Sequence, residues 1–377
     1  MKSPRPLLAL TTLFALFWMG PSTFALINID GTRNQIFVFG SASFAWDSNI
    51  YSEGTAKGDY TTTAAAGVEL KRRAGIIAVN ATMSMSVLRF ASHTGENSAN
   101  PSFNLALNKS TGRTTGTITV SAFRESRSDS AVNLRTQSWN FPLGLSLKYP
   151  VSERFYLTSE SSYLNRRYAS GSGGLANYTD YAEGVNIFYI YTSKLDLLGG
   201  YRLRVTDTSA DAGTLDHAFT LGATGGILPK VNGIINFGYQ IRDMNDRSET
   251  FSSFTTSSSL TWTATRRFSL TAQFSRDFST TATASSVDAM GTLLRAAYIF
   301  TRRLSVSSGL GYGRNKFLGD NVAARRDKYI SCELGVQYAY NEHLSLSTNY
   351  NHIRNTSTVD YADFVRDSYT LALSSRF

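Results

Sequence analysis

Hydrophobic and polar residues alternate along most of the chain with a period of two. In the segment 139–149, aromatic and aliphatic residues stand at the odd positions and small or polar residues stand between them. The same alternation runs through 79–87, 268–275 and 304–313. Because successive side chains of a β-strand point to opposite faces, these segments predict strands with one apolar and one small, polar face. We find no segment with the 3.6-residue period of an amphipathic helix.

The length of these runs separates two kinds of β-protein. Strands of a soluble sandwich usually have about five or six residues, whereas a strand tilted through a bilayer needs about nine to eleven. The runs here reach that greater length, and their polar face is rich in Ser, Thr, Gly and Asn rather than in Lys and Glu. A small, polar face is typical of a water-filled lumen. We therefore predict an all-β fold, a transmembrane antiparallel up-and-down β-barrel.

Short and long connections alternate between the predicted strands. Segments 192–194 and 301–302 are short turns, whereas 168–177 and 315–327 are long and polar. Bacterial outer-membrane barrels have short turns at one end and long loops at the other. The pattern gives about 18 strands, with 16 as the next best count. The barrel has to close, because lipid cannot form hydrogen bonds with a free sheet edge.

Aromatic residues cluster at two heights, as the interfacial girdles of such barrels require. Those next to the short turns are Tyr149, Phe155, Tyr191, Phe268, Phe300 and Tyr340, and those toward the long loops are Tyr163, Tyr178, Tyr239, Phe278, Tyr312 and Tyr350.

The first 25 residues have the pattern of a secretory signal peptide. Lys2 and Arg5 precede an apolar stretch at 7–19, and small residues lead up to Ala25. We expect cleavage after Ala25, which leaves 26–377 as the exported barrel. A retained anchor helix is the alternative, but about 13 apolar residues are too few to span a bilayer.

Composition excludes several other classes of protein. Charged residues are 17% of the chain, below the roughly 25% of soluble domains, and 12% are aromatic. The single cysteine, Cys332, excludes an internal disulfide and a cysteine-based zinc site, and we expect it on the lipid face. The net charge of +9 is scattered along the chain, so no nucleic-acid footprint is present. We expect no cofactor and no metal.

Catalysis has little support in the sequence. Asp216 and His217 are adjacent at the height of the rim, where some outer-membrane proteases place Asp and His, and His343 is another candidate base. A general base needs an oriented partner and a substrate cleft, which a neighbouring pair does not provide. The glycines in 309–313 lie in a strand rather than before a helix, so they form no dinucleotide loop. We interpret them as relieving crowding inside the barrel.

The lumen face is the predicted functional surface, because a barrel of this size encloses an aqueous channel. A slight excess of basic residues there predicts a weak preference for anions or acidic sugars. Paired lumen charges without selectivity are the alternative, and a register error of one residue would turn these side chains toward lipid. By strand parity, the inward-facing charged residues are Lys148, Arg202, Arg204, Arg242, Arg295, Glu69, Glu160, Asp277 and Glu333.

The last strand carries a pattern of its own. Tyr369, Leu371, Leu373 and Phe377 share one face. This resembles the C-terminal strand signature of bacterial outer-membrane barrels, which end in an aromatic residue. The resemblance implies recognition by the barrel-assembly machinery. Ser375 stands where a large apolar residue is commoner in that signature.

Two further stretches have patterns of their own. One is the aromatic strand end at 43–51 with Gly-Asp-Tyr at 58–60. The other is a unit repeated at 298–306 and 338–346, in which an aromatic strand end is followed by a short turn and then by a strand of alternating apolar residues and serines. Both stretches resemble the β-barrel porins found beside exopolysaccharide export or exosortase gene clusters. The resemblance implies an outer-membrane pore or scaffold tied to polysaccharide export.

We therefore expect an outer-membrane porin-like barrel that provides a passive polar channel for small solutes or polysaccharide. A non-conducting structural or surface-polymer-binding barrel is the alternative, with the loops Asn315–Asp327 and Tyr168–Asn177 as candidates to fold inward and plug it. A barrel hydrolase is the third hypothesis. The expected partners are outer-membrane lipid and the barrel-assembly machinery, and the oligomeric state stays open.

Overall fold

The computed structural model describes residues 27–29, 34–73, 75–169, 174–210, 212–245, 249–319 and 325–377. The predicted signal peptide and its cleavage site after Ala25 lie outside these residues. None of the helices among the described residues has the length and apolarity needed to cross a membrane. Two short 3-10 turns, η2 (Thr94–Glu96) and η3 (Asp360–Ala362), lie in the connections between strands.

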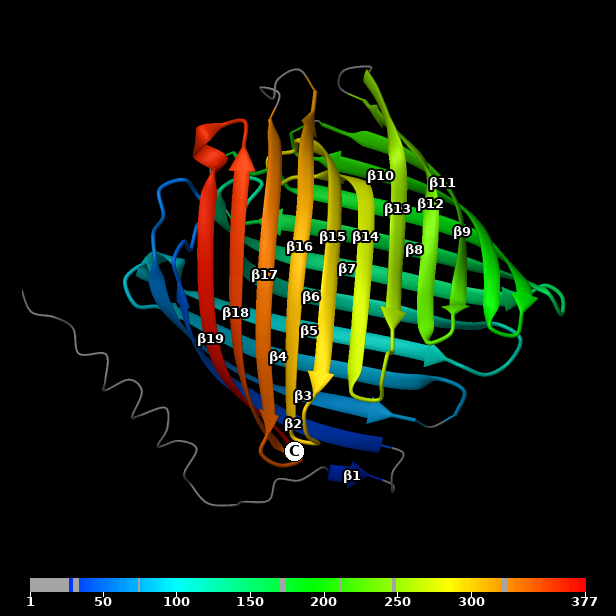
Figure 1. Ribbon diagram of the computed structural model, residues 1–377, viewed down its shortest axis with the longest axis horizontal. Coiled ribbons are helices and arrows are strands. Elements are labelled where there is room, and N and C mark those ends of the chain that lie inside the picture. Colours follow the sequence, from blue (N-terminus) through cyan, green and yellow to red (C-terminus); the bar gives the residue numbers. More distant parts are fainter. Residues whose placement is uncertain are drawn as a thin grey trace, which may run out of the picture.

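Eighteen long strands form a closed antiparallel barrel (Figure 1). Each strand pairs with its neighbours in chain order, and β19 pairs with β2 to close the ring. The strands are β2 (Asn34–Asp47), β3 (Asp59–Arg72), β4 (Ala78–Phe90), β5 (Ser98–Lys109), β6 (Thr115–Asp129), β7 (Leu134–Pro150), β8 (Phe155–Tyr168), β9 (Tyr178–Thr192), β10 (Leu195–Thr208), β11 (Thr214–Leu228), β12 (Val231–Met244), β13 (Glu249–Trp262), β14 (Phe268–Thr280), β15 (Ser286–Ile299), β16 (Leu304–Leu318), β17 (Arg326–Ala339), β18 (Leu344–Ser357) and β19 (Phe364–Arg376).

The predicted fold class is confirmed, and the strand count is 18 rather than 16. A short additional strand, β1 (Ile27–Ile29), pairs with the first residues of β2. The β19–β2 pairing ends at Arg376 and Phe39, and β1 pairs with β2 from Ile36, three residues nearer the start of β2. β1 therefore extends the seam at the short-turn end, where the edge of β2 would otherwise be unpaired.

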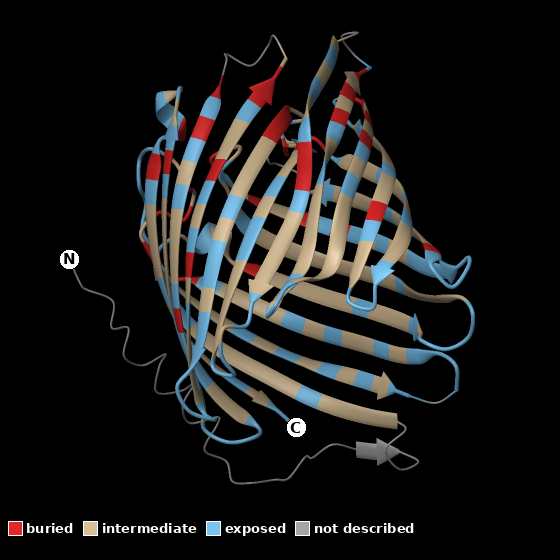
Figure 2. Ribbon diagram, turned by 45° about the vertical axis from the view of Figure 1, so that its right-hand side comes forward, coloured by how far each residue is buried: buried red, intermediate tan, exposed pale blue. Residues whose placement is uncertain are grey.

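The alternation of apolar and polar residues becomes an alternation of faces. On β4, Met83 and Met85 are 64% and 45% exposed, and on β11 Phe219 and Leu221 are 55% and 73% exposed. Large apolar side chains with this much exposure form a contiguous outer band, which is stable only against lipid. Buried residues instead gather at the long-loop end of the barrel (Figure 2).

The girdle of aromatic side chains at the short-turn end is present. Tyr191, Phe300 and Tyr340 are all more than half exposed on the outer face. At the long-loop end, Tyr239 and Tyr312 also face outward, but two predicted members do not. The parity of β9, in which the odd-numbered residues are exposed, turns Tyr178 inward, where the Arg166 guanidinium lies 5.3 Å from its ring centroid. Phe278 is only 2% exposed, for a reason that concerns the site itself.

Candidate functional site

The upper part of the β14–β15 hairpin leaves the barrel wall. Pairing between β13 and β14 ends at Thr256 and Arg276, although β13 continues to Glu249 and β14 to Thr280. β14 and β15 stay paired with each other up to Thr280 and Ser286. The end of this hairpin is thereby free to turn away from β13 and into the mouth of the barrel (Figure 1).

Contacts of the hairpin end place it against the inner side of β12. The Arg242 guanidinium, on β12, lies 5.1 Å from the ring centroid of Phe278. Arg242 Nη1 also donates to the Ser279 carbonyl oxygen at 3.0 Å and to Ser286 Oγ at 3.2 Å. Phe278 is therefore buried inside the barrel mouth, which corrects its predicted place in the outer girdle.

The tip of the hairpin contacts the loop between β8 and β9. The Ala176 backbone N–H, in the β8–β9 loop, donates to the Ala282 carbonyl oxygen at 2.7 Å, and both alanines are buried. Four strands separate β9 from β14 in the sheet, so this contact crosses part of the opening. The hairpin end 277–288 is called the inserted hairpin below.

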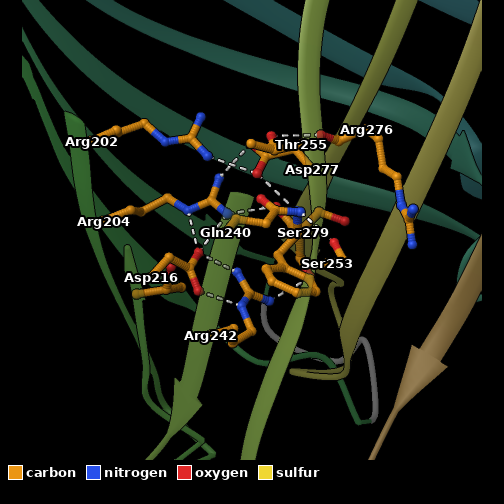
Figure 3. A network of polar contacts seen from close by, with 12 residues as sticks. Arg202, Arg204, Asp216, Gln240, Arg242, Ser253, Thr255, Arg276, Asp277 and Ser279 are labelled. Carbon is orange, nitrogen blue, oxygen red and sulfur yellow. Dashed lines mark hydrogen bonds and ion pairs between the residues drawn. The ribbon is translucent and has the colours of Figure 1, made fainter. Parts of the chain in front are cut away.

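A network of five charged residues fixes the inserted hairpin (Figure 3). Asp277 accepts from Arg202 Nη2 at 2.7 Å and from Arg204 Nη1 at 3.2 Å. Asp216 accepts from Arg204 Nε at 2.7 Å, and it accepts from Arg242 Nε and Nη2 at 2.6 and 2.7 Å. Three guanidinium groups thus share two carboxylates.

Strand register explains why part of this network forms. Arg204, Asp216 and Arg242 stand directly opposite one another on β10, β11 and β12, all on the inner face. Opposite charges at facing positions stabilise an antiparallel sheet. Arg242 is 0% and Asp216 2% exposed, so their two-point ion pair is shielded from solvent. The third partner, Asp277, comes from β14 and depends on the inward turn of the hairpin.

A second group of contacts joins three connections at the long-loop end: the β6–β7 turn, the β2–β3 loop and the segment just before β17. Arg325, just before β17, donates to the carbonyl oxygens of Ala131 and Ser130 in the β6–β7 turn, at 2.8 and 3.2 Å. The same turn is tied to the β2–β3 loop, because Asn133 Nδ2 donates to the Ser52 carbonyl oxygen at 2.6 Å. Arg325 is buried and also pairs with Asp327 at 2.7 Å. The β6–β7 turn therefore leans over the opening.

The predicted plug-forming loops contribute only in part. In the segment Tyr168–Asn177, Ala176 contacts the inserted hairpin, and in Asn315–Asp327, Arg325 contacts the β6–β7 turn. Residues 170–173 and 320–324 of these loops lie outside the described part of the chain. Among the described residues, the β14–β15 hairpin end turns into the mouth, and the sequence analysis does not predict this insertion. The polar loop of this hairpin is short. Its inward course is visible only in the structure, where the ends of its two strands are buried.

All nine charged residues predicted for the lumen lie on the inner face, as the exposed apolar residues beside them demonstrate. Arg295 and Glu333 pair at 2.9 Å across the intervening β16, where Gly309 faces both. Glu69 pairs with Arg376 at 2.6 Å. The ammonium of Lys148 lies 3.7 Å from the ring centroid of Tyr156. Glu160 shares this face, and the remaining residues, Arg202, Arg204, Arg242 and Asp277, belong to the network at the mouth.

The residues considered for catalysis do not come together. Asp216 points inward to the arginines, whereas His217 lies on the outer face, where its Nδ1 is 2.8 Å from Tyr201 Oη. His343 is at the short-turn end, with Nδ1 2.9 Å from the Arg376 carbonyl oxygen. Within the described residues, no three His, Cys, Asp or Glu side chains are grouped closely enough to hold a metal. Cys332 follows the parity of the exposed Leu334 and Ile330 on β17 and so faces outward.

The predicted assembly signal occupies the outer face of β19. Tyr369, Leu371 and Phe377 are between 41% and 53% exposed there, and Leu373 shares their parity. The ring of Tyr369 stacks on that of Tyr350 at 4.6 Å between centroids. Recognition of these residues by the assembly machinery stays a prediction.

The closed barrel, its apolar outer band and its polar interior define a porin-like barrel of the bacterial outer membrane. Residues 209–377, which contain β11 to β19, match the family model described as "Putative beta-barrel porin 2". This confirms the resemblance to β-barrel porins over that part of the chain. No curated protein matches the sequence.

Solved outer-membrane channels share the fold at very low sequence identity. OccK5 (OpdH) of Pseudomonas aeruginosa is 9% identical, with a TM-score of 0.55 over 92% of this chain and 98% of that one. OpdQ of the same organism is 10% identical, with a TM-score of 0.51 over 91% and 98% of the two chains. OccAB4 of Acinetobacter baumannii is 12% identical, also with a TM-score of 0.51 over 91% and 98%. At such identities the likeness establishes the fold alone.

Proposed function

We propose that the chain is a passive channel for small polar solutes, with a weak preference for anions set at its mouth. The observation that carries this proposal is the charge balance of the network, in which three guanidinium groups face two carboxylates. Arg202 is the most accessible of the three, with 35% of its side chain exposed. Side-chain charge at a constriction sets the ion selectivity of a pore.

The lumen below the mouth supports passage rather than tight binding. Arg295 with Glu333 is a partly exposed ion pair, and Glu69 is shared by Arg376 and Lys71. Water screens such pairs strongly, and they hold a solute only weakly. Selectivity is then decided where the passage is narrowest and most charged. The proposed link to polysaccharide export has only the resemblance in the sequence to support it.

A closed, non-conducting barrel is the second candidate, and the inserted hairpin favours it. The hydrogen bond between Ala176 and Ala282 joins the hairpin tip to the β8–β9 loop, and the Arg325 contacts join the start of β17 to the β6–β7 turn across the mouth. If these contacts seal the passage in the resting state, both sets would have to break before the barrel could conduct. A plugged barrel would then serve as a scaffold or a binding surface.

Planar-bilayer recording separates the two candidates. The purified chain is compared with a variant in which Asn-Gly replaces residues 278–288, a change that removes the hairpin end and keeps the pairing of Asp277 with Ala289. A conducting native barrel with an anion-shifted reversal potential supports the passive channel. A silent native barrel and a conducting variant support the plug. Silence of both variants, each verified as folded, would overturn the channel proposal.

A further inference from the structure

Five cationic side chains lie together on three neighbouring strands at the long-loop end. They are paired across the sheet: Lys316 faces Arg326, and Arg314 faces Lys328. Arg354, on β18, faces Ile330, two residues from Lys328 on β17. The cationic patch is defined by Arg314, Lys316, Arg326, Lys328 and Arg354.

The patch is on the outer face of the barrel. On β17, and on β16 as far as Lys316, the even-numbered residues point outward, as the exposures of Leu310 (60%), Tyr312 (42%) and Ile330 (59%) demonstrate. Leu318, the next even-numbered residue of β16, is buried where it pairs with Ser286 of the inserted hairpin. The odd-numbered Phe317 and Asp327, between the cations in sequence, are buried on the inner side. The cations therefore continue the lipid-facing rows of these strands rather than the lumen-facing ones.

The height of the patch coincides with the membrane surface. A strand rises about 3.4 Å per residue, and a tilt of about 40° reduces the vertical rise to roughly 2.6 Å. From Leu304, at the start of β16, to Arg314 the strand then climbs about 26 Å, close to the roughly 25 Å of an outer-membrane apolar band. Arg314 and Lys328 thus stand at the level of the headgroups, directly above Tyr312 and Ile330.

The described residues show no ion pair for any of the five cations. The carboxylates that strand register places beside the patch have other partners: exposed Asp363, two residues before the Val365 that faces Arg354, accepts from the Ser357 backbone N–H. Asp288, opposite Lys316, binds Arg276 at 2.7 Å, and Asp367 is 2.8 Å from His352 Nδ1. Like charges at facing positions destabilise a sheet, and the Lys316–Arg326 and Arg314–Lys328 pairs are both of this kind.

We propose that the cationic patch binds the phosphate groups of the glycolipid that forms the outer leaflet. Guanidinium and ammonium groups are the side chains that recognise phosphate best, and cations at a membrane surface attract anionic lipid. The exposed Leu310, Tyr312 and Ile330 below the patch lie against the acyl chains of the same molecule. The combination fits a phosphorylated amphiphile, and it does not depend on whether the barrel conducts.

The test measures binding of diphosphoryl lipid A to the full-length barrel in detergent, by native mass spectrometry and by thermal shift. The variant Arg314→Gln/Lys328→Gln/Arg354→Gln removes three of the five charges. A matched control, Arg266→Gln/Arg302→Gln/Arg303→Gln, removes three exposed arginines from the short turns at the other end. Heat-modifiable mobility on a denaturing gel verifies that each barrel is folded.

We expect the native barrel and the control to bind lipid A equally, and the patch variant to bind at least tenfold more weakly. Dephosphorylated lipid A is expected to bind as weakly to the native barrel as lipid A does to the patch variant. Inorganic phosphate should not compete at millimolar concentration, because the apolar contacts are missing. Equal binding by the folded patch variant, equal binding of the dephosphorylated lipid, or full competition by free phosphate would each overturn the proposal.

Discussion

Arg204 on β10 and Asp277 on β14 are separated by three strands in the sheet, yet Arg204 Nη1 lies 3.2 Å from Asp277 Oδ2. The contact exists only because the end of the β14–β15 hairpin turns into the barrel. Arg204 Nη2 also donates to the Phe278 carbonyl oxygen at 2.6 Å, so one arginine binds both the side chain and the backbone of the hairpin. The electrostatics and the width of the mouth are therefore coupled.

Asp277→Asn tests this coupling. The substitution removes one lumen carboxylate and weakens the contact of the hairpin with Arg202 and Arg204. Because the pair is partly exposed, we expect a stability loss of only about 1 kcal/mol, but a higher single-channel conductance and a reversal potential shifted toward anions.

Glu333→Gln is the matched control for this substitution. It also removes one lumen carboxylate, that of the wall-bound pair with Arg295, and leaves the hairpin untouched. It should shift the selectivity without raising the conductance. If both variants give the same conductance, the inserted hairpin does not limit the passage.

Arg242→Met probes the buried part of the network. The change leaves Asp216 with a single arginine partner in a site that is 2% exposed, and an incompletely compensated buried charge costs about 3–5 kcal/mol. Arg295→Met, in a pair with half-exposed groups, should cost less than about 1 kcal/mol. Urea unfolding in detergent or lipid vesicles measures both. Equal losses would mean that the Arg242–Asp216 pair is not shielded from water.

Arg325→Met should loosen the β6–β7 turn. The turn loses hydrogen bonds at the Ala131 and Ser130 carbonyl oxygens, so we expect it to move away from the opening. The measurement is the rate at which a bulky maleimide labels Ala131→Cys in a Cys332→Ser background. Arg303→Met, in a short turn at the opposite end, serves as the control. Labelling that is equally slow in both backgrounds would contradict a role of Arg325 in holding the turn.

Strand parity accounts for how much of this protein the sequence predicts. The alternation in a run such as 139–149 predicts both that the segment is a strand and which of its side chains face the lumen. Eighteen such runs predict a closed barrel. The same reasoning fails for Phe278 and Tyr178. Parity assigns Phe278 to the lipid face, but β14 has separated from β13 at that height, and its outward face packs against β12. The prediction for Tyr178 rests on its aromatic character alone, whereas the parity of β9 turns this even-numbered residue inward.

The network shows a second limit of local patterns. The parity of their own strands identifies Arg204 and Arg242 as lumen residues. Their contact with Asp216 depends on the register between adjacent strands. The contact of both Arg202 and Arg204 with Asp277 joins β10 to β14, and no spacing along the chain encodes it. Only a three-dimensional description of where the hairpin ends reveals which lumen charges meet.

Gly313 supports the interpretation that glycines relieve crowding on the inner face. A Cβ atom at that position would lie 2.1 Å from Cζ of Tyr329, whose ring covers the glycine from the facing strand. The ring can rotate away, so an alanine is expected to be tolerated there at modest cost. A glycine whose nearest neighbour is a backbone atom is expected to tolerate alanine less well, because the backbone cannot move aside in this way.

Gly238 on β12 is such a position. A Cβ atom there would lie 1.9 Å from the Phe219 carbonyl oxygen of β11, so Gly238→Ala has to push two paired strands apart. Overpacking of this kind costs about 1–3 kcal/mol, and here it also disturbs the β11–β12 register that places Asp216 opposite Arg242. We expect lower stability in urea unfolding together with a loss of anion preference. Gly291→Ala, whose nearest neighbour would be Tyr329 Oη at 3.4 Å, is the control and should change neither property. A Gly238→Ala barrel as stable and as selective as the control would refute the close approach of β11 and β12.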